Sequence, residues 1–287
     1  MASVKDLRDR IRSLKNTQQI TKAMKQVAAA RIRRAEMLQK QSRPYADALG
    51  AMLRDLIANV SSVDHPFMKP GREGAPTGII LMTADKGLAG AFNANLIREA
   101  EVLGRRDSNL AWYAVGVKAR NALRRQTGPT EHFWPLTQGI MIDVAREIAQ
   151  KVTDDFVAGK IGGITLISPK LVSMMSQKPE TRAIIPITRE KSEAQVSDGP
   201  KGAVEFEPSP EAVLSRLLPK YLEFTIYSSM LETNAAFFAA QLIAMNNATD
   251  NAKKLIDELT IAMNNARQAS ITKEILEIVG GAEALAG

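Results

Sequence analysis

Two segments of the chain contain neither glycine nor proline over lengths that ordinary helices do not reach. The first covers residues 1–43, and the second covers residues 220–279, a run of 60 residues. Helices in globular proteins usually span roughly 8–20 residues, whereas a helix of this longer run would measure ~90 Å. A domain built from the residues between the two runs would be only roughly 35–40 Å across. The terminal segments are therefore expected to project as a shaft or lever, which argues against a pocket enzyme.

The C-terminal run has the apolar spacing of a coiled coil. Steps of four and three residues give ten apolar positions out of eleven, a pattern typical of a left-handed coiled coil. These positions are Leu231, Ala235, Phe238, Leu242, Met245, Thr249, Ala252, Ile256, Leu259, Met263 and Ala266. Beyond Ala266 the same steps reach Ser270, Lys273 and Glu277. We expect the partner helix to end near Ala266, the tip to continue alone, and Gly280 with Gly281 to stop it.

The N-terminal run shows a similar but interrupted pattern. Val4, Leu7, Ile11 and Leu14 fit the coiled-coil spacing, and the apolar pattern resumes at Ile20, Met24 and Val27 after a polar stretch at 16–19. This predicts a three-residue slip that locally overwinds the supercoil. The helix is expected to continue to about Asn59, with Pro44 marking a kink or a boundary.

Two such helices at opposite ends of one chain predict an antiparallel pair, because each apolar stripe must be covered. The alternative is that each helix packs separately on a core or on another subunit. The two ends are assigned to residues 1–59 and 209–287, as one discontinuous coiled-coil domain.

The middle of the chain alternates between strand-like and helix-like segments. Short apolar runs predict strands at 78–83, 110–115 and 161–168 and a possible fourth at 182–187, and helices are expected at 91–103, 118–125 and 140–157. A linker rich in Pro and Gly precedes them at 64–78, and the polar segment 188–202 is expected to be mobile. This alternation predicts a small, Rossmann-like parallel α/β domain at 76–190.

The positive charge is concentrated at the N-terminus. The chain carries a net charge of +7, and residues 1–43 alone hold twelve Lys and Arg against three acidic residues. Such a basic face is either solvated or meets an acidic protein or a polyanion. The longest uncharged stretch, residues 233–249, is shorter than the ~20 residues that a membrane-spanning helix needs. It is interpreted as a buried helix face.

No catalytic, cofactor or metal site is predicted. The chain has no Cys, which excludes disulfides and thiolate chemistry. Gly87 and Gly90 follow the first strand but form no known phosphate-binding motif, so a tight turn is the simpler interpretation. His65 and His132 are far apart and are interpreted as surface residues. The acidic pair at 154–155 is interpreted as closing a helix.

Several segments resemble the gamma subunit of rotary ATP synthases. They are IRSLKNTQQITKAMKQVAAA at 11–30, DKGLAGAFN at 85–93, FEPSP at 206–210, ATDN at 248–251 and ARQASITKEILEIVGGA at 266–282. The resemblance implies a bent coiled-coil shaft inside a ring of three alpha and three beta subunits, with the α/β domain near the epsilon subunit and the membrane c-ring. It implies a subunit that couples proton or sodium flow to ATP synthesis or hydrolysis without catalysing either. Its place would be peripheral, on the cytoplasmic face of a bacterial plasma membrane.

The resemblance also implies roles for nine residues. Lys22, Met24 and Lys25 match the motif that faces the acidic lever loop of beta. Arg267, Gln268, Thr272 and Glu274 match the motif near the rotor catch and upper bearing. Phe206 and Glu207 match the segment near the foot that meets the c-ring. For each residue the alternative is ordinary coiled-coil packing or solvation.

The sequence departs from the family pattern in the C-terminal run. Family members often carry a Ser-Glu-His stretch and an Arg where this chain has Ala236, Phe237, Phe238 and Gln241, and Lys is common where Asn246 stands. The usual arginine-mediated contact with beta is therefore not expected. Phe237 and Phe238 predict a more apolar contact instead.

Two other classes of function stay open at the sequence level. One is an α/β nucleotide-binding protein with a coiled-coil arm, which tight binding of ATP or NAD would indicate. The other is a basic coiled coil that binds nucleic acid, although its cations have no aromatic stacking partners. A strongly salt-dependent affinity for DNA would support the latter.

Overall fold

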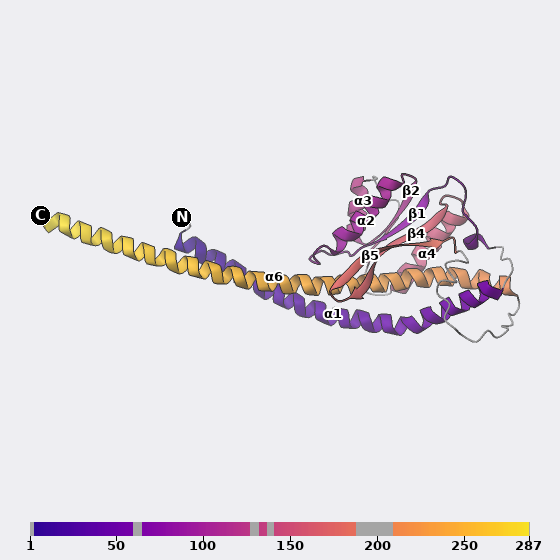
Figure 1. Ribbon diagram of the computed structural model, residues 1–287, viewed down its shortest axis with the longest axis horizontal. Helices are drawn as coiled ribbons and strands as arrows, with labels where there is room; N and C mark the ends of the chain where they lie inside the picture. The colour runs from indigo at the N-terminus through magenta and orange to yellow at the C-terminus, as the bar shows by residue number, and fades with distance from the viewer. Residues whose placement is uncertain (1–2, 60–64, 127–131, 137–140, 188–208, 287) are drawn as a thin grey trace. The chain divides into compact units, whose positions relative to one another are not determined.

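The computed structural model describes residues 3–59, 65–126, 132–136, 141–187 and 209–286 (Figure 1). The chain divides into two compact units, each described by itself. The helix-pair unit comprises Met1–Ala29 and Gln241–Gly287, and the sheet unit comprises residues 30–240. Each of the two long helices contributes residues to both units. The predicted domain boundaries instead keep each helix whole, and they stay a prediction.

Helix α1 covers Val4–Asn59. Its first turn is closed by a reciprocal pair of hydrogen bonds, because the Asp6 N–H donates to Ser3 Oγ and the Ser3 N–H donates to Asp6 Oδ2, both at 3.1 Å. These bonds from Ser3 hold the pKa of the Asp6 carboxyl below its ordinary value. The helix continues through Pro44, so the boundary predicted as one alternative is not present at that residue.

Helix α6 covers Pro210–Ala286 and begins ten residues before the stretch that lacks glycine and proline, one residue after the start assigned to the C-terminal segment. Ser209 caps it, since its hydroxyl accepts a hydrogen bond from the Ala212 N–H at 3.2 Å. The predicted stop at Gly280 and Gly281 is wrong, because the helix runs through both. Glycine lowers helix stability by about 1 kcal/mol relative to alanine without forbidding the conformation. The alanine-rich residues that follow favour continuation.

A five-stranded sheet forms the centre of the sheet unit, in the order β3-β2-β1-β4-β5. Neighbouring strands among β1 to β4 are parallel, whereas β5 is antiparallel to β4. The possible fourth strand of the predicted parallel sheet is therefore the second arm of a hairpin, and β3 was not predicted. The strands are β1 (Thr77–Met82), β2 (Leu110–Val115), β3 (His132–Trp134), β4 (Gly163–Ser173) and β5 (Ser176–Ile185).

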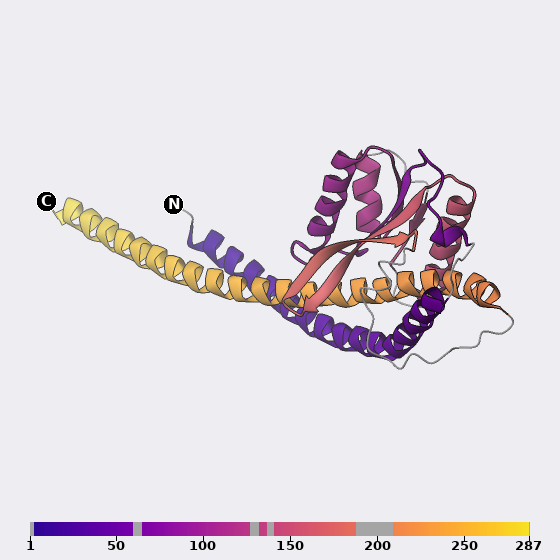
Figure 2. The ribbon, with the colours of Figure 1, turned by 45° about the vertical axis from the view of Figure 1, so that its right-hand side comes forward.

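Helices cover both faces of this sheet (Figure 2). They are α2 (Phe92–Arg106), α3 (Val117–Gln126) and α4 (Met141–Val157), and a short 3-10 helix, η1 (Pro66–Met68), lies in the predicted linker. Side chains of β1 alternate between the two faces. Ile79 and Leu81 pack with α2 and α3, whereas Ile80 and Met82 pack with α4 and with α6 residues before Thr233.

Phe237 and Phe238 lie in the core of the sheet unit. They are 5% and 2% exposed, and Phe237 packs edge-to-face on Phe92 of α2 with ring centroids 5.9 Å apart. The Arg31 guanidinium lies 5.5 Å from the centroid of the Phe238 ring. The apolar contact predicted for these two residues is therefore made within the chain, because aromatic rings of this size are most stable when removed from water.

Candidate functional site: the paired terminal helices

Two hydrogen bonds between α1 and α6 fix the direction of the pair in the helix-pair unit. The Thr249 hydroxyl lies 2.8 Å from that of Thr21, and Lys25 Nζ donates to Asn246 Oδ1 at 2.6 Å. Moving forward along α1 therefore means moving backward along α6. The predicted antiparallel pairing is confirmed for this unit, in which the two helices lie side by side (Figure 1).

The predicted slip in the N-terminal seam is wrong. Ile20 and Val27 are 61% and 51% exposed, whereas Thr21 and Ala28 are buried. The buried and half-buried positions of α1 keep an unbroken alternation of three- and four-residue steps. Within the helix-pair unit this alternation is formed by Val4, Leu7, Ile11, Leu14, Gln18, Thr21, Lys25 and Ala28, and Met24 and Ala29 are half-buried next to it. The coiled-coil spacing continues, and polar side chains occupy part of it.

Pairing within the seam explains why polar residues are tolerated there. Thr21 and Thr249 bond each other, and each also lies within hydrogen-bonding distance of a carbonyl of its own helix. Asn246 accepts from Lys25 and donates through Nδ2 to Asp250 Oδ2 at 3.1 Å. Buried polar groups that find partners avoid the cost of an unmade hydrogen bond. These contacts went unpredicted, although strict heptad spacing would have placed Thr21 and Lys25 in the seam.

The exposed apolar and basic side chains of α1 lie on different sides of the helix. Ile20 and Val27 follow the spacing of one helical stripe that also includes the half-buried Met24. Lys22 is exposed as well, but it is two positions from both Ile20 and Met24 and therefore lies away from this stripe. Of the three α1 residues predicted to meet a partner, Lys22 lies outside the seam, whereas Lys25 occupies a seam position and bonds Asn246.

The C-terminal tip of α6 has no cover within the unit. Every residue from 267 to 282 is exposed, which agrees with the predicted end of the partner helix near Ala266. Thr272 bonds the carbonyl of Gln268 at 3.0 Å, and Glu274 accepts from the Ser270 hydroxyl at 3.2 Å. Large apolar side chains are also exposed there, namely Ile271, Ile275, Leu276, Ile278 and Val279. Phe206 and Glu207 lie outside the described residues.

The turn after β1 is closed by protein groups where a nucleotide-binding α/β protein would hold phosphate. Asp85 Oδ1 accepts hydrogen bonds from the N–H groups of Val117 and Leu136, at 2.9 and 3.0 Å. The carboxylate thus lies at the N-terminus of α3, the position that favours an anion. Asn93 Oδ1 accepts from the Ala84 N–H at 3.0 Å and ties the turn to α2.

A cavity of about 310 Å³ opens beside this turn. Asp85, Lys86, Arg31 and Asn234 line it together with apolar side chains. Gly116 has a positive φ of 93°, and a Cβ at this position would collide with the carbonyl of Thr83. Of the two glycines interpreted as forming a tight turn, Gly90 has a positive φ of 57°, whereas a Cβ at Gly87 would meet no heavy atom closer than 3.9 Å.

A buried carboxylate lies at the end of α4. Asp155 is 4% exposed, and its oxygens contact the Tyr113 hydroxyl at 2.9 Å and Lys151 Nζ at 2.9 Å. Burial favours the neutral acid, but the bonds from Lys151, Tyr113 and Lys160 outweigh it and hold the pKa of Asp155 below its ordinary value. Asp155 therefore lies near the end of α4, as predicted, and its buried carboxylate also connects α4 to β2 through Tyr113.

Neither histidine is an isolated surface residue, contrary to the prediction. His132 belongs to β3, stacks on Tyr113 with ring centroids 5.4 Å apart and lies 3.9 Å from Asp155. His65 caps η1, because its Nδ1 accepts a hydrogen bond from the Phe67 N–H at 3.1 Å. Burial lowers the pKa of His65. Both positions follow from packing that a single sequence does not reveal.

Within the described part of the chain, no three His, Asp or Glu side chains are grouped so that they could hold a metal ion. None of the helices described there is long and apolar enough to cross a bilayer. A chain whose ends pair as antiparallel helices while its middle folds as an α/β sheet defines a coiled-coil shaft protein. The comparisons with known proteins identify which family of shaft protein this is.

The family model described as ATP synthase matches residues 3–285. The ATP synthase gamma chain of Heliobacterium modesticaldum is 44% identical over 99% of this chain and 100% of its own length. That of Chlorobaculum tepidum is 39% identical over 99% of both chains. The chain belongs to the ATP synthase gamma chain family.

Solved structures share the fold. A chain of the Euglena gracilis mitochondrial ATP synthase superposes with a TM-score of 0.67 at 16% identity, covering 98% of this chain and 94% of that one. A chain from the central stalk and c-ring of the Tetrahymena thermophila mitochondrial enzyme gives 0.59 at 22% identity, covering 80% and 99%.

Proposed function

We propose that the chain is the central rotor shaft of an ATP synthase, which transmits torque between a membrane c-ring and a ring of three alpha and three beta subunits. The observation that carries this proposal is the bare tip of α6, where residues 267–282 are all exposed and five large apolar side chains face outward. A lone helix with this surface is suited to a surrounding protein sleeve, since exposed apolar patches mark interaction sites. Membership of the gamma chain family supports the same role.

The coupling follows from symmetry. One shaft without threefold symmetry, inside a ring of three like catalytic subunits, must touch each of them differently. Each orientation then stabilises one pattern of open and closed catalytic sites through differential contact energy. In this proposal the chain is not catalytic and needs no cofactor, and hydrolysis or synthesis takes place on beta.

Partner contacts are proposed for two regions of the helix-pair unit. Lys22, Met24 and Lys25 meet the acidic lever loop of beta in this proposal, because two cations complement the charge of such a loop. Lys22 is exposed, and Met24 and Lys25 are half-buried. Lys25 keeps donor capacity for this contact, since an ammonium has three N–H groups and one bonds Asn246. At the tip, the proposed contacts of the rotor catch and upper bearing are Arg267, Gln268, Thr272 and Glu274.

The remaining proposed partners lie at the other end of the complex. Phe206 and Glu207 are assigned to the side that meets epsilon and the c-ring. The chain would then be peripheral to a bacterial plasma membrane, on its cytoplasmic face. Proton and sodium ions both stay open as the coupling ion, because that choice is made in the c-ring.

Affinity purification of the tagged chain from gently solubilised membranes tests the assignment. Recovery of alpha, beta and c subunits with ATPase activity is the expected result. Recovery of the chain alone, or together with nucleic acid, would overturn it.

Cross-linking tests the contact residues. Because the chain has no Cys, a single introduced cysteine is the one thiol of this subunit. Lys22→Cys in the assembled enzyme is expected to cross-link to beta with a short thiol-to-amine reagent. Lys40→Cys, an exposed position further along the same helix, is the matched control. Equal yields of beta cross-links from both variants would contradict the assignment of Lys22.

A further inference from the structure

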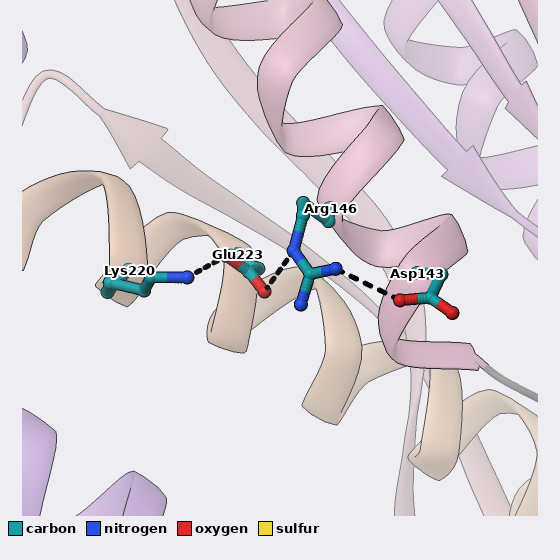
Figure 3. Close-up of polar contacts among 4 residues, drawn as sticks. All are labelled: Asp143, Arg146, Lys220 and Glu223. Atoms are coloured by element: carbon teal, nitrogen blue, oxygen red, sulfur yellow. Dashed lines mark hydrogen bonds and ion pairs between the residues drawn. The ribbon is translucent and has the colours of Figure 1, made fainter.

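A group of charged side chains joins α4 to α6 within the sheet unit (Figure 3). Glu223 of α6 accepts hydrogen bonds on both carboxylate oxygens, from Arg146 Nε of α4 at 3.2 Å and from Lys220 Nζ at 2.8 Å. Arg146 also donates through Nη1 to Asp143 Oδ1 at 3.0 Å. The Glu223 carboxylate therefore bridges two helices.

The bridge is anchored on its carboxylate side. The Glu223 side chain is 11% exposed, whereas that of Arg146 is 56% exposed and that of Lys220 57%. A carboxylate so removed from water is strongly destabilised without its cations, which ties its position to theirs. Both cations are more than half exposed. Replacing one of them still leaves the Glu223 carboxylate with the other cation as its partner.

Two more polar contacts hold the same stretch of α6. The Leu171 N–H of β4 donates to Glu232 Oε1 at 2.9 Å, and Arg182 of β5 lies 3.4 Å from the Ser229 hydroxyl. With Glu223 these contacts connect three different elements to ten residues of α6. Apolar packing is non-directional and resists separation more than rotation, whereas hydrogen bonds fix direction. The polar contacts therefore set how α6 is turned in the sheet unit.

We propose that Arg146 and Glu223 are positioning residues for torque transfer, holding α6 against rotation relative to the α/β sheet when the enzyme works against an ion gradient. This inference rests on the proposed rotor function. Arg146 is the decisive member, because it comes from α4 and makes the bond between elements. Lys220 neutralises the same carboxylate from within α6, so its bond to Glu223 connects no second element.

The test compares Arg146→Gln with Lys220→Gln in the whole enzyme in sealed vesicles. Each variant removes one cation from Glu223, but only the first removes the bond between helices. ATP hydrolysis and ion transport are measured together, first without a gradient and then against increasing opposing gradients. With Arg146→Gln, hydrolysis without transport is expected to rise about two- to fivefold under load, the range that corresponds to losing one partly exposed ion pair. Hydrolysis without a gradient should equal that of wild type.

Lys220→Gln and the conservative Arg146→Lys are expected to keep the wild-type transport ratio at every gradient. Equal ratios for Arg146→Gln and wild type under all loads would overturn the proposal. So would a loss of hydrolysis without load together with a lower melting temperature, because that result indicates a merely structural bond. If the wild-type enzyme hydrolyses ATP but transports no ions, the proposed rotor function itself fails.

Discussion

Lys25 and Asn246, 221 positions apart in the sequence, are joined across the helix pair by a hydrogen bond of 2.6 Å. One step away in the seam, Thr21 and Thr249 form a second polar contact. Polar residues at seam positions specify the register of a coiled coil at some cost in stability. Here they agree on a single antiparallel register, so each contact reinforces the alignment that the other requires.

Thr249→Val tests the hydroxyl contact. The substitution keeps the volume of the side chain and removes its bond to Thr21, so the full chain should lose about 0.5–1.5 kcal/mol of unfolding free energy. In the double variant with Thr21→Val the two losses should not add, because both remove the same bond. Urea unfolding of the full chain measures all three variants. Thr17→Val is the control, since that exposed hydroxyl bonds the carbonyl of Ser13 of its own helix. Additive losses would contradict the contact.

Asp85→Ala tests the carboxylate at the N-terminus of α3. The N–H groups of Val117 and Leu136 lose their acceptor, and an unmade bond at a part-buried N–H costs about 1–3 kcal/mol. Asp85→Asn keeps an acceptor oxygen and loses only the favourable charge at the helix terminus, about 0.3–1 kcal/mol. Urea denaturation should rank the two variants in that order. Asp107→Ala removes a comparable but exposed bond to the Asn109 N–H, and equal destabilisation by both alanine variants would refute this role.

The sequence predicted the direction of the helix pair and most of the sheet, but it misjudged the seam of α1. Periodicity assumes that apolar residues face inward. Ile20 and Val27 break that assumption because they are exposed, whereas Thr21 is buried and has a polar partner on α6. Such pairing depends on residues more than two hundred positions away, which no local pattern contains.

The missed parts of the sheet have local causes. Strand β3 has only three residues, too few for a period of two to be recognised. The hairpin between β4 and β5 turns at Met174 and Met175, which lack the glycine or asparagine that marks most tight hairpins. Phe237 and Phe238 were assigned to a partner because a helix in a shaft offers its side chains to whatever surrounds it. In the structure Phe237 packs against the buried Phe92 of α2 instead, a contact that the sequence pattern does not show.

His65 should make stability depend on pH in the neutral range. Its pKa in the folded chain lies below the ordinary value of 6.5, because burial disfavours the charged ring. The unfolded chain therefore binds more protons as the pH falls below about 6.5, so stability is fully present above that value and is lost as the pH falls toward the folded pKa. Protonation also removes the Nδ1 lone pair that accepts from the Phe67 N–H. His65→Asn supplies an acceptor that does not titrate.

Unfolding free energies of the full chain at pH 8, 7, 6 and 5.5 measure this effect. The difference between wild type and His65→Asn should shift against wild type as the pH falls, because the two chains differ in no other titrating group. A difference that stays constant across these pH values would mean that His65 keeps its ordinary pKa.

Met24→Lys tests the outer face of α1 in the whole enzyme. Met24 is half-buried between the exposed Ile20 and Val27, and a lysine there would place a new charge within the apolar stripe proposed to meet the lever loop of beta. An extra cation facing acidic side chains binds them in every orientation of the shaft. It should therefore weaken the differences among the three contacts on which coupling depends. Assembly and ATP hydrolysis should suffer less than ion transport per ATP hydrolysed.

ATP-driven ion pumping and ATP hydrolysis, measured on the same vesicles, give that ratio. Met37→Lys is the matched control, because Met37 is 56% exposed on the same helix, outside the stripe of Ile20, Met24 and Val27. The control should keep the wild-type ratio, which separates an effect of the added charge from an effect of its position. An unchanged ratio in Met24→Lys would show that this face of α1 does not carry the coupling contact, and the assignment of Met24 would lose its support.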